Sequence, residues 1–180
     1  MRPAVINMSL SSSAYSTLDT AVTNAVSAGF STVVAAGNSS ADACLSSPAR
    51  AAAAITVGAT TSADAKASYS NYGTCLDLFA PGSSVTSAWY TSTTATATSS
   101  GTSMAAPHVA GVVARLLQAN PSASASNITS TLLSATTSNI LGSVGVGSPN
   151  RMLFAQDTVT SEPVASEPVA SLSVSVANLA

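Results

Sequence analysis

Charged side chains are the scarcest feature of this sequence of 180 residues. Only 7% of the residues are charged, and the formal net charge is −2. Such a chain lacks the basic surface that nucleic-acid phosphates require, so we expect no nucleic-acid partner. It also lacks a run of about 18 apolar residues, so we expect no membrane span. Residues 1–7 are too short and too polar for a signal peptide.

Aromatic residues are also few, at 4%, whereas Ala, Ser and Thr dominate the sequence. Small side chains let helices pack closely on a sheet, so the low charge does not by itself indicate a membrane protein. A chain of this length can form one domain with a sizeable core.

Short apolar stretches alternate with segments of helical periodicity. We expect strands at residues 4–10, 31–36, 55–59, 76–80 and 83–90. We expect helices from a capping box at 16–19 to Gly29, from about Ser103 to Asn120, and at 123–135. A strand, a helix and a strand at this spacing form parallel neighbours with a right-handed crossover. The sequence therefore predicts an α/β fold, with a mostly parallel sheet and helices on both faces.

The composition changes after Gln156. The sequence Ser-Glu-Pro-Val-Ala at 161–165 is repeated at once at 166–170, and a proline every five residues prevents regular structure. We expect residues 1–156 to form the folded domain and residues 157–180 to form a linker or a flexible tail. Residues 171–180 are either the first strand of a further domain or no folded element.

The stretch Gly-Thr-Ser-Met-Ala-Ala-Pro-His-Val-Ala-Gly at 101–111 places a hydroxyl group at the start of a helix. We expect Pro107 in the first turn, where a helix has no amide partner to lose. Free N–H groups and the positive end of the helix dipole would then surround Ser103, which suits a nucleophile that creates an oxyanion. Taken alone, Thr-Ser before an apolar helix is also a common cap.

The complete motif resembles the nucleophile segment of the subtilisin-like serine proteases (peptidase S8), and the surrounding sequence is most similar to their proteinase K branch. It differs from the G-x-S-x-G elbow, because Met104 and Ala105 follow Ser103. The resemblance covers residues 2–156 and implies the carboxy-terminal part of a subtilisin-like domain whose amino-terminal strands are missing. It implies a secreted serine endopeptidase that cleaves extended peptides or proteins, with Ser103 as its nucleophile.

Two further segments match the active site of this family. Asn38 matches the oxyanion-hole donor, although Gly-Asn after a strand is also a common turn. The substrate cleft matches Ser9, Leu10, Ser11, Ala35, Ala36 and Gly37. Relatives carry glycine where this chain has Ser11 and Ser12, so we expect Ser11 to narrow the pocket for a substrate side chain.

The resemblance also implies a calcium site and a disulfide bond. Asp77 matches a calcium-binding aspartate that acts with the carbonyls of Ala52 and Ala54, and oxygen ligands suit calcium. The alternative is that Asp77 simply faces solvent. Cys44 and Cys75 match a disulfide of some relatives, which would indicate an oxidising compartment. The alternative is two free buried cysteines.

The histidine and aspartate of a serine protease triad are the residues that this chain lacks. In the family they lie in Asp-Thr-Gly and His-Gly-Thr segments before the nucleophile, and neither segment occurs here. The single histidine, His108, lies five residues after Ser103 and points elsewhere on the helix, so we expect it to be packed or partly buried. We therefore expect a protease piece that is inactive alone. The alternatives are a peptide-binding pseudoprotease, an unstable fragment, or a split enzyme whose missing amino-terminal piece supplies both residues.

Overall fold

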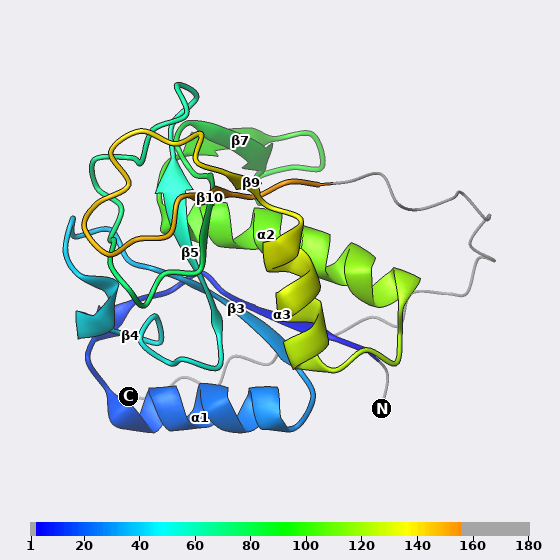
Figure 1. Ribbon diagram of the computed structural model, residues 1–180. Coiled ribbons are helices and arrows are strands. Elements are labelled where there is room, and N and C mark those ends of the chain that lie inside the picture. Colours follow the sequence, from blue (N-terminus) through cyan, green and yellow to red (C-terminus); the bar gives the residue numbers. More distant parts are fainter. Residues whose placement is uncertain (1–2, 156–180) are drawn as a thin grey trace, which may run out of the picture.

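A computed structural model describes residues 3–155, which are built around a six-stranded sheet in the order β1-β3-β5-β6-β10-β9 (Figure 1). Four parallel strands form its main part: β1 (Val5–Met8), β3 (Ser31–Ala35), β5 (Ile55–Thr60) and β6 (Leu78–Pro81). The short β10 (Arg151–Met152) is parallel to β6, and β9 (Thr137–Ser138) is antiparallel to β10. The prediction of a mostly parallel sheet is confirmed. Strands β9 and β10 were not expected.

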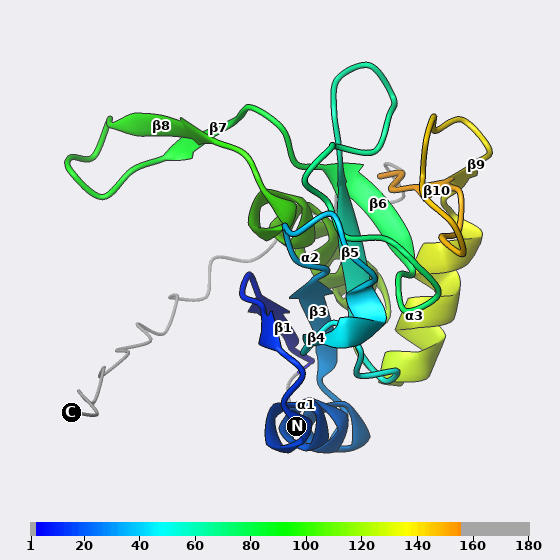
Figure 2. The same cartoon turned by 90° about the vertical axis from the view of Figure 1, so that its left-hand side faces the viewer.

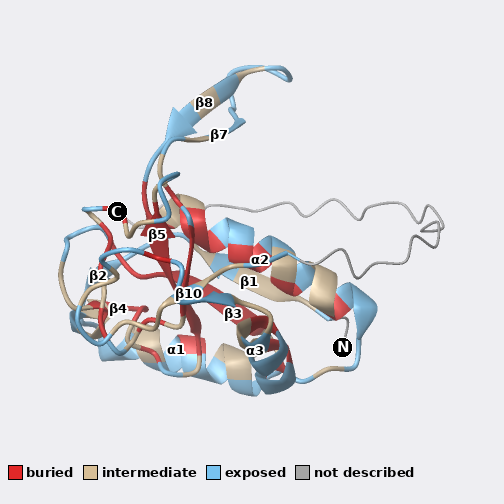
Figure 3. Cartoon of the chain, turned by 45° about the horizontal axis from the view of Figure 1, so that its top comes forward, coloured by how far each residue is buried: buried red, intermediate tan, exposed pale blue. Residues whose placement is uncertain are grey.

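Helices cover both faces of this sheet, as predicted. Helix α1 (Ser16–Ser27) lies on one face, and α2 (Thr102–Ala119) and α3 (Ala125–Ser134) lie on the other (Figure 1). The central strands β3 and β5 are buried along their whole length (Figure 3). The residues of α2 that pack on them are Ala105, Ala106, Val109, Val113 and Leu117, all buried. From Ala106 on, these buried residues recur every three or four positions, so one face of α2 is in the core.

The two ends of α1 differ in how well the sequence predicted them. The capping-box prediction is wrong, because Ser16 is already helical and the N-cap residue, Tyr15, makes no side-chain cap bond. The predicted left-handed end at Gly29 is confirmed. Its φ is +97°, its N–H donates to the Val26 carbonyl, and the Phe30 N–H donates to the Ala25 carbonyl.

Helix α2 starts earlier than expected relative to its proline. Gly101 is the N-cap residue and Thr102 is the first helical residue, so Pro107 is the sixth and lies inside the helix. The prediction that Pro107 belongs to the first turn is therefore wrong. The helix ends at Ala119, with Asn120 as C-cap, as predicted.

Two small sheets flank the main one. Strands β2 (Ser12–Ser13) and β4 (Ser46–Ser47) pair beside a short 3-10 helix, η1 (Ala43–Leu45). Strands β7 (Val85–Ala88) and β8 (Thr96–Ser99) form a hairpin that projects from the body of the protein (Figure 2). We expected one strand at 83–90 followed by a loop, so the hairpin is a correction. Among residues 3–155, no helix is both long and apolar enough to cross a membrane.

Candidate active site

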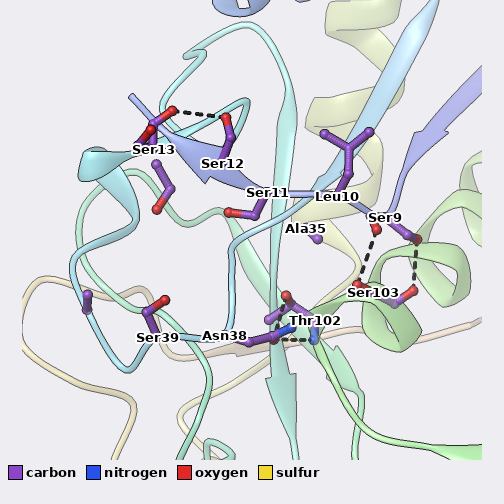
Figure 4. Close-up of a pocket in the computed structure, with 12 residues that line it drawn as sticks. Ser9, Leu10, Ser11, Ser12, Ser13, Ala35, Asn38, Ser39, Thr102 and Ser103 are labelled. Atoms are coloured by element: carbon purple, nitrogen blue, oxygen red, sulfur yellow. Dashed lines mark hydrogen bonds between the residues drawn. The ribbon is translucent and has the colours of Figure 1, made fainter. Parts of the chain in front are cut away.

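Ser103 lies in the first turn of α2 and faces the segment that follows β1. Its Oγ donates a hydrogen bond to the Ser9 carbonyl at 3.2 Å, and the Ser9 Oγ donates one back to the Ser103 carbonyl at 2.8 Å (Figure 4). The Ser103 N–H has no acceptor within the described part of the chain. The start of α2 thus presents a hydroxyl and a free N–H at one point.

Asn38 follows β3 and contacts the same end of α2. Its Oδ1 accepts hydrogen bonds from the Thr102 N–H at 2.8 Å and from the Thr102 hydroxyl at 2.9 Å (Figure 4). Both bonds fix the amide plane and leave its exposed Nδ2 group free to donate. A Cβ on Gly101 would lie 3.3 Å from Nδ2, so a side chain there would crowd this donor. The arrangement places a fixed donor beside Ser103, as an oxyanion site requires.

Thr102 is a site residue that the sequence analysis did not single out. Its side chain is fully buried, accepts from the Gly37 N–H at 3.1 Å and donates to Asn38 Oδ1. It therefore joins α2 to the segment after β3. The one indication in the sequence was that a hydroxyl residue directly precedes Ser103 in the motif.

Asn71 is a second residue that the sequence analysis missed. It is only 1% exposed. Its Oδ1 accepts from the N–H groups of Ser39 and Ala41 at 2.9 and 3.1 Å, and its Nδ2 donates to the Ala36 carbonyl at 2.8 Å. Asn71 thus holds the chain on both sides of Asn38. These partners lie 30 to 35 residues away, and no local pattern indicates them.

A cleft of about 750 Å³ opens beside Ser103 and Asn38. Of the residues predicted for the substrate cleft, four line it: Ser9, Leu10, Ser11 and Ala35. Ala36 and Gly37 do not line it, because Ala36 packs into the core and Asn71 and Ser11 cover Gly37. Residues 9–11 lie between β1 and β2 and belong to neither strand.

Ser11 lines this cleft and covers Gly37. Its Oγ would lie 3.0 Å from a Cβ placed on Gly37. The hydroxyl therefore takes up space that a glycine at position 11 would leave open. The cleft is also lined by other hydroxyl residues, among them Ser12, Ser13, Ser39 and Ser46.

Asp77 lies just before β6, since this strand starts at Leu78 and not at residue 76 as predicted. Its Oδ2 accepts from the Thr56 N–H at 2.8 Å. Burial raises the pKa of the Asp77 carboxyl, while the bond from Thr56 and the charge of Arg151 act in the opposite direction. The carboxylate therefore faces the protein rather than open solvent.

The surroundings of Asp77 offer backbone carbonyls and few charged side chains. The Asp77 N–H donates to the Thr56 carbonyl, which places the side chain next to the segment that contains Ala52 and Ala54. The carbonyls of these alanines accept no hydrogen bond within the described residues. Residues 3–155 contain no group of three His, Cys, Asp or Glu side chains that could hold a metal. An ion here would depend on carbonyls and one carboxylate.

Within residues 3–155, His108 and the aspartates form no triad with Ser103. His108 is exposed, and its Nδ1 lies 2.8 Å from the Met104 carbonyl of the same helix; the prediction that it is packed or partly buried is wrong. Asp19 pairs with Arg50 at 2.6 Å, and Asp42 accepts from the Cys44 N–H.

The predicted disulfide between Cys44 and Cys75 is present and closes a separation of 31 residues. It joins η1 to the segment that leads into Asp77 and β6. Neither cysteine is free, so the alternative of two buried thiols is wrong.

Comparisons with known proteins agree with this geometry. The sequence model of the subtilase family, peptidase S8, matches residues 1–153. The chain is 61% identical to the extracellular serine proteinase of Thermus sp. (strain Rt41A) over 154 residues, which are 86% of this chain and 38% of that protein. It is 51% identical over 154 residues to alkaline serine exoprotease A of Vibrio alginolyticus, covering 85% of this chain and 28% of that protein.

The fold is also similar to that of solved structures. The crystal structure of a cold-adapted subtilisin-like serine proteinase superposes with a TM-score of 0.83 at 47% identity. The match covers 87% of this chain and 56% of that protein. The chain therefore spans about a third of the length of these curated relatives and about half of this solved structure.

Proposed function

The chain belongs to the subtilase family of serine proteases, and on that premise we propose that it carries the nucleophile, the oxyanion site and part of the substrate cleft of a serine endopeptidase. The observation that supports this most directly is the start of α2. There the Ser103 hydroxyl, the free Ser103 N–H and the fixed Asn38 amide meet at one edge of the cleft.

The proposed reaction is acyl transfer to Ser103. The Ser103 Oγ gives its proton to a general base and attacks the carbonyl carbon of the scissile peptide bond, and the resulting oxyanion accepts hydrogen bonds from Asn38 Nδ2 and the Ser103 N–H. When this intermediate collapses, the C–N bond breaks, the amine leaves with the proton from the base, and the acyl group stays on Ser103. The peptide extends along residues 9–11, where its own N–H bonds to the Ser9 carbonyl. That carbonyl now accepts from the Ser103 hydroxyl, so a bound peptide would release the hydroxyl for attack.

The 180 residues alone are proposed to be inactive. The single histidine, His108, follows Ser103 on the same helix, and its Nδ1 lies against the Met104 carbonyl. The Ser103 hydroxyl donates to the Ser9 carbonyl and not to this imidazole, so no histidine accepts the Ser103 proton in this structure. We propose that an amino-terminal segment with the Asp-Thr-Gly and His-Gly-Thr sequences supplies the base and its aspartate, either within a longer polypeptide or as a partner. Loss of a triad member costs several powers of ten in rate. Without that segment, the cleft would bind peptides and leave them intact.

Two further features of the proposal concern stability and location. Asp77, with the carbonyls of Ala52 and Ala54, would hold a calcium ion that ties β6 to the segment before β5. The Cys44–Cys75 disulfide and the extracellular relative from Thermus support a site of action outside the cell.

A fluorophosphonate probe tests the proposal, because it reacts only with an activated serine. The samples are the 180-residue chain, the same chain joined behind the amino-terminal half of a relative's catalytic domain (the completed protease), and the Ser103→Ala variant of each. We expect labelling of the completed protease alone, lost in Ser103→Ala. Labelling of the isolated chain would contradict the proposal that it is inactive. If the completed protease folds but is not labelled, only the peptide-binding alternative would remain.

A further inference from the structure

The Ser103 carbonyl lacks the donor that an α-helix normally provides. In a regular helix the C=O of residue 103 accepts from the N–H of residue 107, and Pro107 has no N–H. Because Pro107 lies inside α2, the gap occurs in the turn that carries the nucleophile. An unpaired carbonyl there would loosen the position of Ser103.

Ser9 supplies the missing hydrogen bond from outside the helix. Its Oγ donates to the Ser103 carbonyl at 2.8 Å, and Asn7 Nδ2 donates to this same Oγ at 2.9 Å. An amide nitrogen only donates, so the Ser9 hydroxyl accepts from Asn7 and directs its single hydrogen to Ser103. The relay therefore runs in one direction, from Asn7 through Ser9 to Ser103.

The hydrogen bond from the Ser9 hydroxyl to the Ser103 carbonyl can be removed while the Ser9 backbone carbonyl, the proposed acceptor for a peptide N–H, is kept. The Ser9 side chain holds the Ser103 carbonyl, whereas the Ser9 backbone carbonyl accepts from the Ser103 hydroxyl. Ser9→Ala deletes the first bond and keeps the carbonyl that a peptide would use. The two roles of Ser9 can thus be measured separately.

We propose that Ser9 is a positioning residue for the nucleophile. Its hydroxyl replaces the helix hydrogen bond that Pro107 cannot make, and so fixes the first turn of α2 against the substrate-binding segment. The catalytic consequence rests on the proposed function. The hydrogen bond from the Ser9 hydroxyl to the Ser103 carbonyl, here called the tether, lies within residues 3–155. It can be tested whether or not the protease is active.

The first test is a double-mutant cycle of Ser9→Ala and Pro107→Ala in the 180-residue chain. The quantity measured is the midpoint temperature of thermal unfolding. Ser9→Ala is expected to lower the midpoint by about 2–4 °C, the effect of losing about one hydrogen bond in a domain of this size. Pro107→Ala restores an N–H at position 107, so Ser9→Ala is expected to have almost no further effect in that background. The control is Ser27→Ala, since the exposed Ser27 hydroxyl has no partner within residues 3–155.

The second test measures peptide hydrolysis by the completed protease. Ser9→Ala is expected to lower kcat about 3- to 10-fold with KM unchanged. Ser9→Thr keeps the hydroxyl and is expected to retain the activity. Pro107→Ala is expected to make kcat insensitive to Ser9→Ala. A general loss of stability would not be rescued in this selective way.

The outcomes separate this proposal from the proposed function. Non-additive effects in both tests support the tether, and so does a Ser9→Ala chain that folds only when Pro107→Ala is also present. Equal effects of Ser9→Ala in both backgrounds, or no effect on the midpoint, overturn it. If the completed protease is inactive with Ser9 and Pro107 intact, the proposed function fails and the thermal cycle alone decides on the tether.

Discussion

Ser103 and Asn38 owe their positions to residues that lie far from them in the sequence. Thr102 bonds both to Asn38 and to the backbone before it, across 64 and 65 residues. Asn71 holds the same loop from the other side. These side chains are buried, so each unpaired group would carry its full desolvation cost if a partner were removed.

Asn71→Ala should therefore weaken both stability and the oxyanion site. The change leaves the Ser39 and Ala41 N–H groups and the Ala36 carbonyl without their partner. We expect a loss of about 2–3 kcal/mol in the free energy of unfolding, measured by urea titration. Asn24→Ala, at an exposed position of α1, is the matched control and should change stability by less than about 0.5 kcal/mol. A loss of the same size in both variants would contradict the role given to Asn71.

Asn38→Leu tests the donor itself. It keeps the approximate size of the side chain but removes the amide, so the oxyanion loses one of its two proposed donors. In the completed protease we expect kcat to fall by about 10²–10³ with little change in KM. An unchanged kcat would mean that Asn38 only shapes the turn after β3.

The residues that the sequence identified at this site are those with a local motif. Ser103 and Asn38 lie in short segments whose neighbouring residues are enough to predict a nucleophile and an oxyanion donor. Thr102, Asn71 and the Ser9 hydroxyl act through contacts across 30 to 94 residues. Such contacts exist only once the sheet is assembled, so no pattern of neighbouring residues could have indicated them.

At the scale of elements, burial decided what the sequence could predict. Strands β3 and β5 consist of small and β-branched residues that are all buried, because both faces of the sheet are covered. The β7–β8 hairpin is mostly exposed and rich in Ser and Thr, so it has no apolar alternation to reveal its second strand. The predicted start of α1 was wrong, because Ser16 is the first helical residue and Tyr15 is the N-cap residue.

Replacing Gly29 and Gly111 with alanine should change the free energy of unfolding in opposite directions. Gly29, after α1, has a φ of +97°, and Gly111 lies within α2; a Cβ at either position would meet no atom within 4 Å. Gly29→Ala should thus lower the free energy of unfolding by about 1–2 kcal/mol through backbone strain alone. Gly111→Ala should raise it by about 0.5–1 kcal/mol, because alanine favours the helix. A rise in the free energy of unfolding for Gly29→Ala, in thermal or urea unfolding, would contradict the left-handed conformation at Gly29, and a fall for Gly111→Ala would contradict its place inside α2.

At the scale of the whole molecule, the disulfide and the proposed calcium site act on the same region. The Cys44–Cys75 bond joins η1 to the segment before β6, and Asp77 lies two residues beyond Cys75. Reducing the bond, or replacing both cysteines with serine, should lower the free energy of unfolding by about 3–4 kcal/mol for a 31-residue loop. Urea unfolding with and without reductant measures this loss, and an unchanged midpoint would contradict it.

Calcium should stabilise the chain through Asp77. A ligand that binds only the folded state adds about 2.7 kcal/mol at a concentration one hundred times its Kd. We therefore expect the thermal midpoint to rise with added calcium and to level off at saturation. Magnesium should have a smaller effect, since it requires near-ideal octahedral geometry and gives up its water reluctantly.

Asp77→Asn distinguishes this site from unspecific ion effects. The asparagine can still accept the Thr56 N–H through its side-chain oxygen, so the local fold is expected to persist. It lacks the charge that, with two carbonyls, would hold the ion, and its midpoint should not respond to calcium. Asp64→Asn is the matched control, because Asp64 is exposed in a turn, and it should keep the full response. A calcium shift that survives Asp77→Asn would place the ion elsewhere and leave Asp77 as a buried acceptor for Thr56.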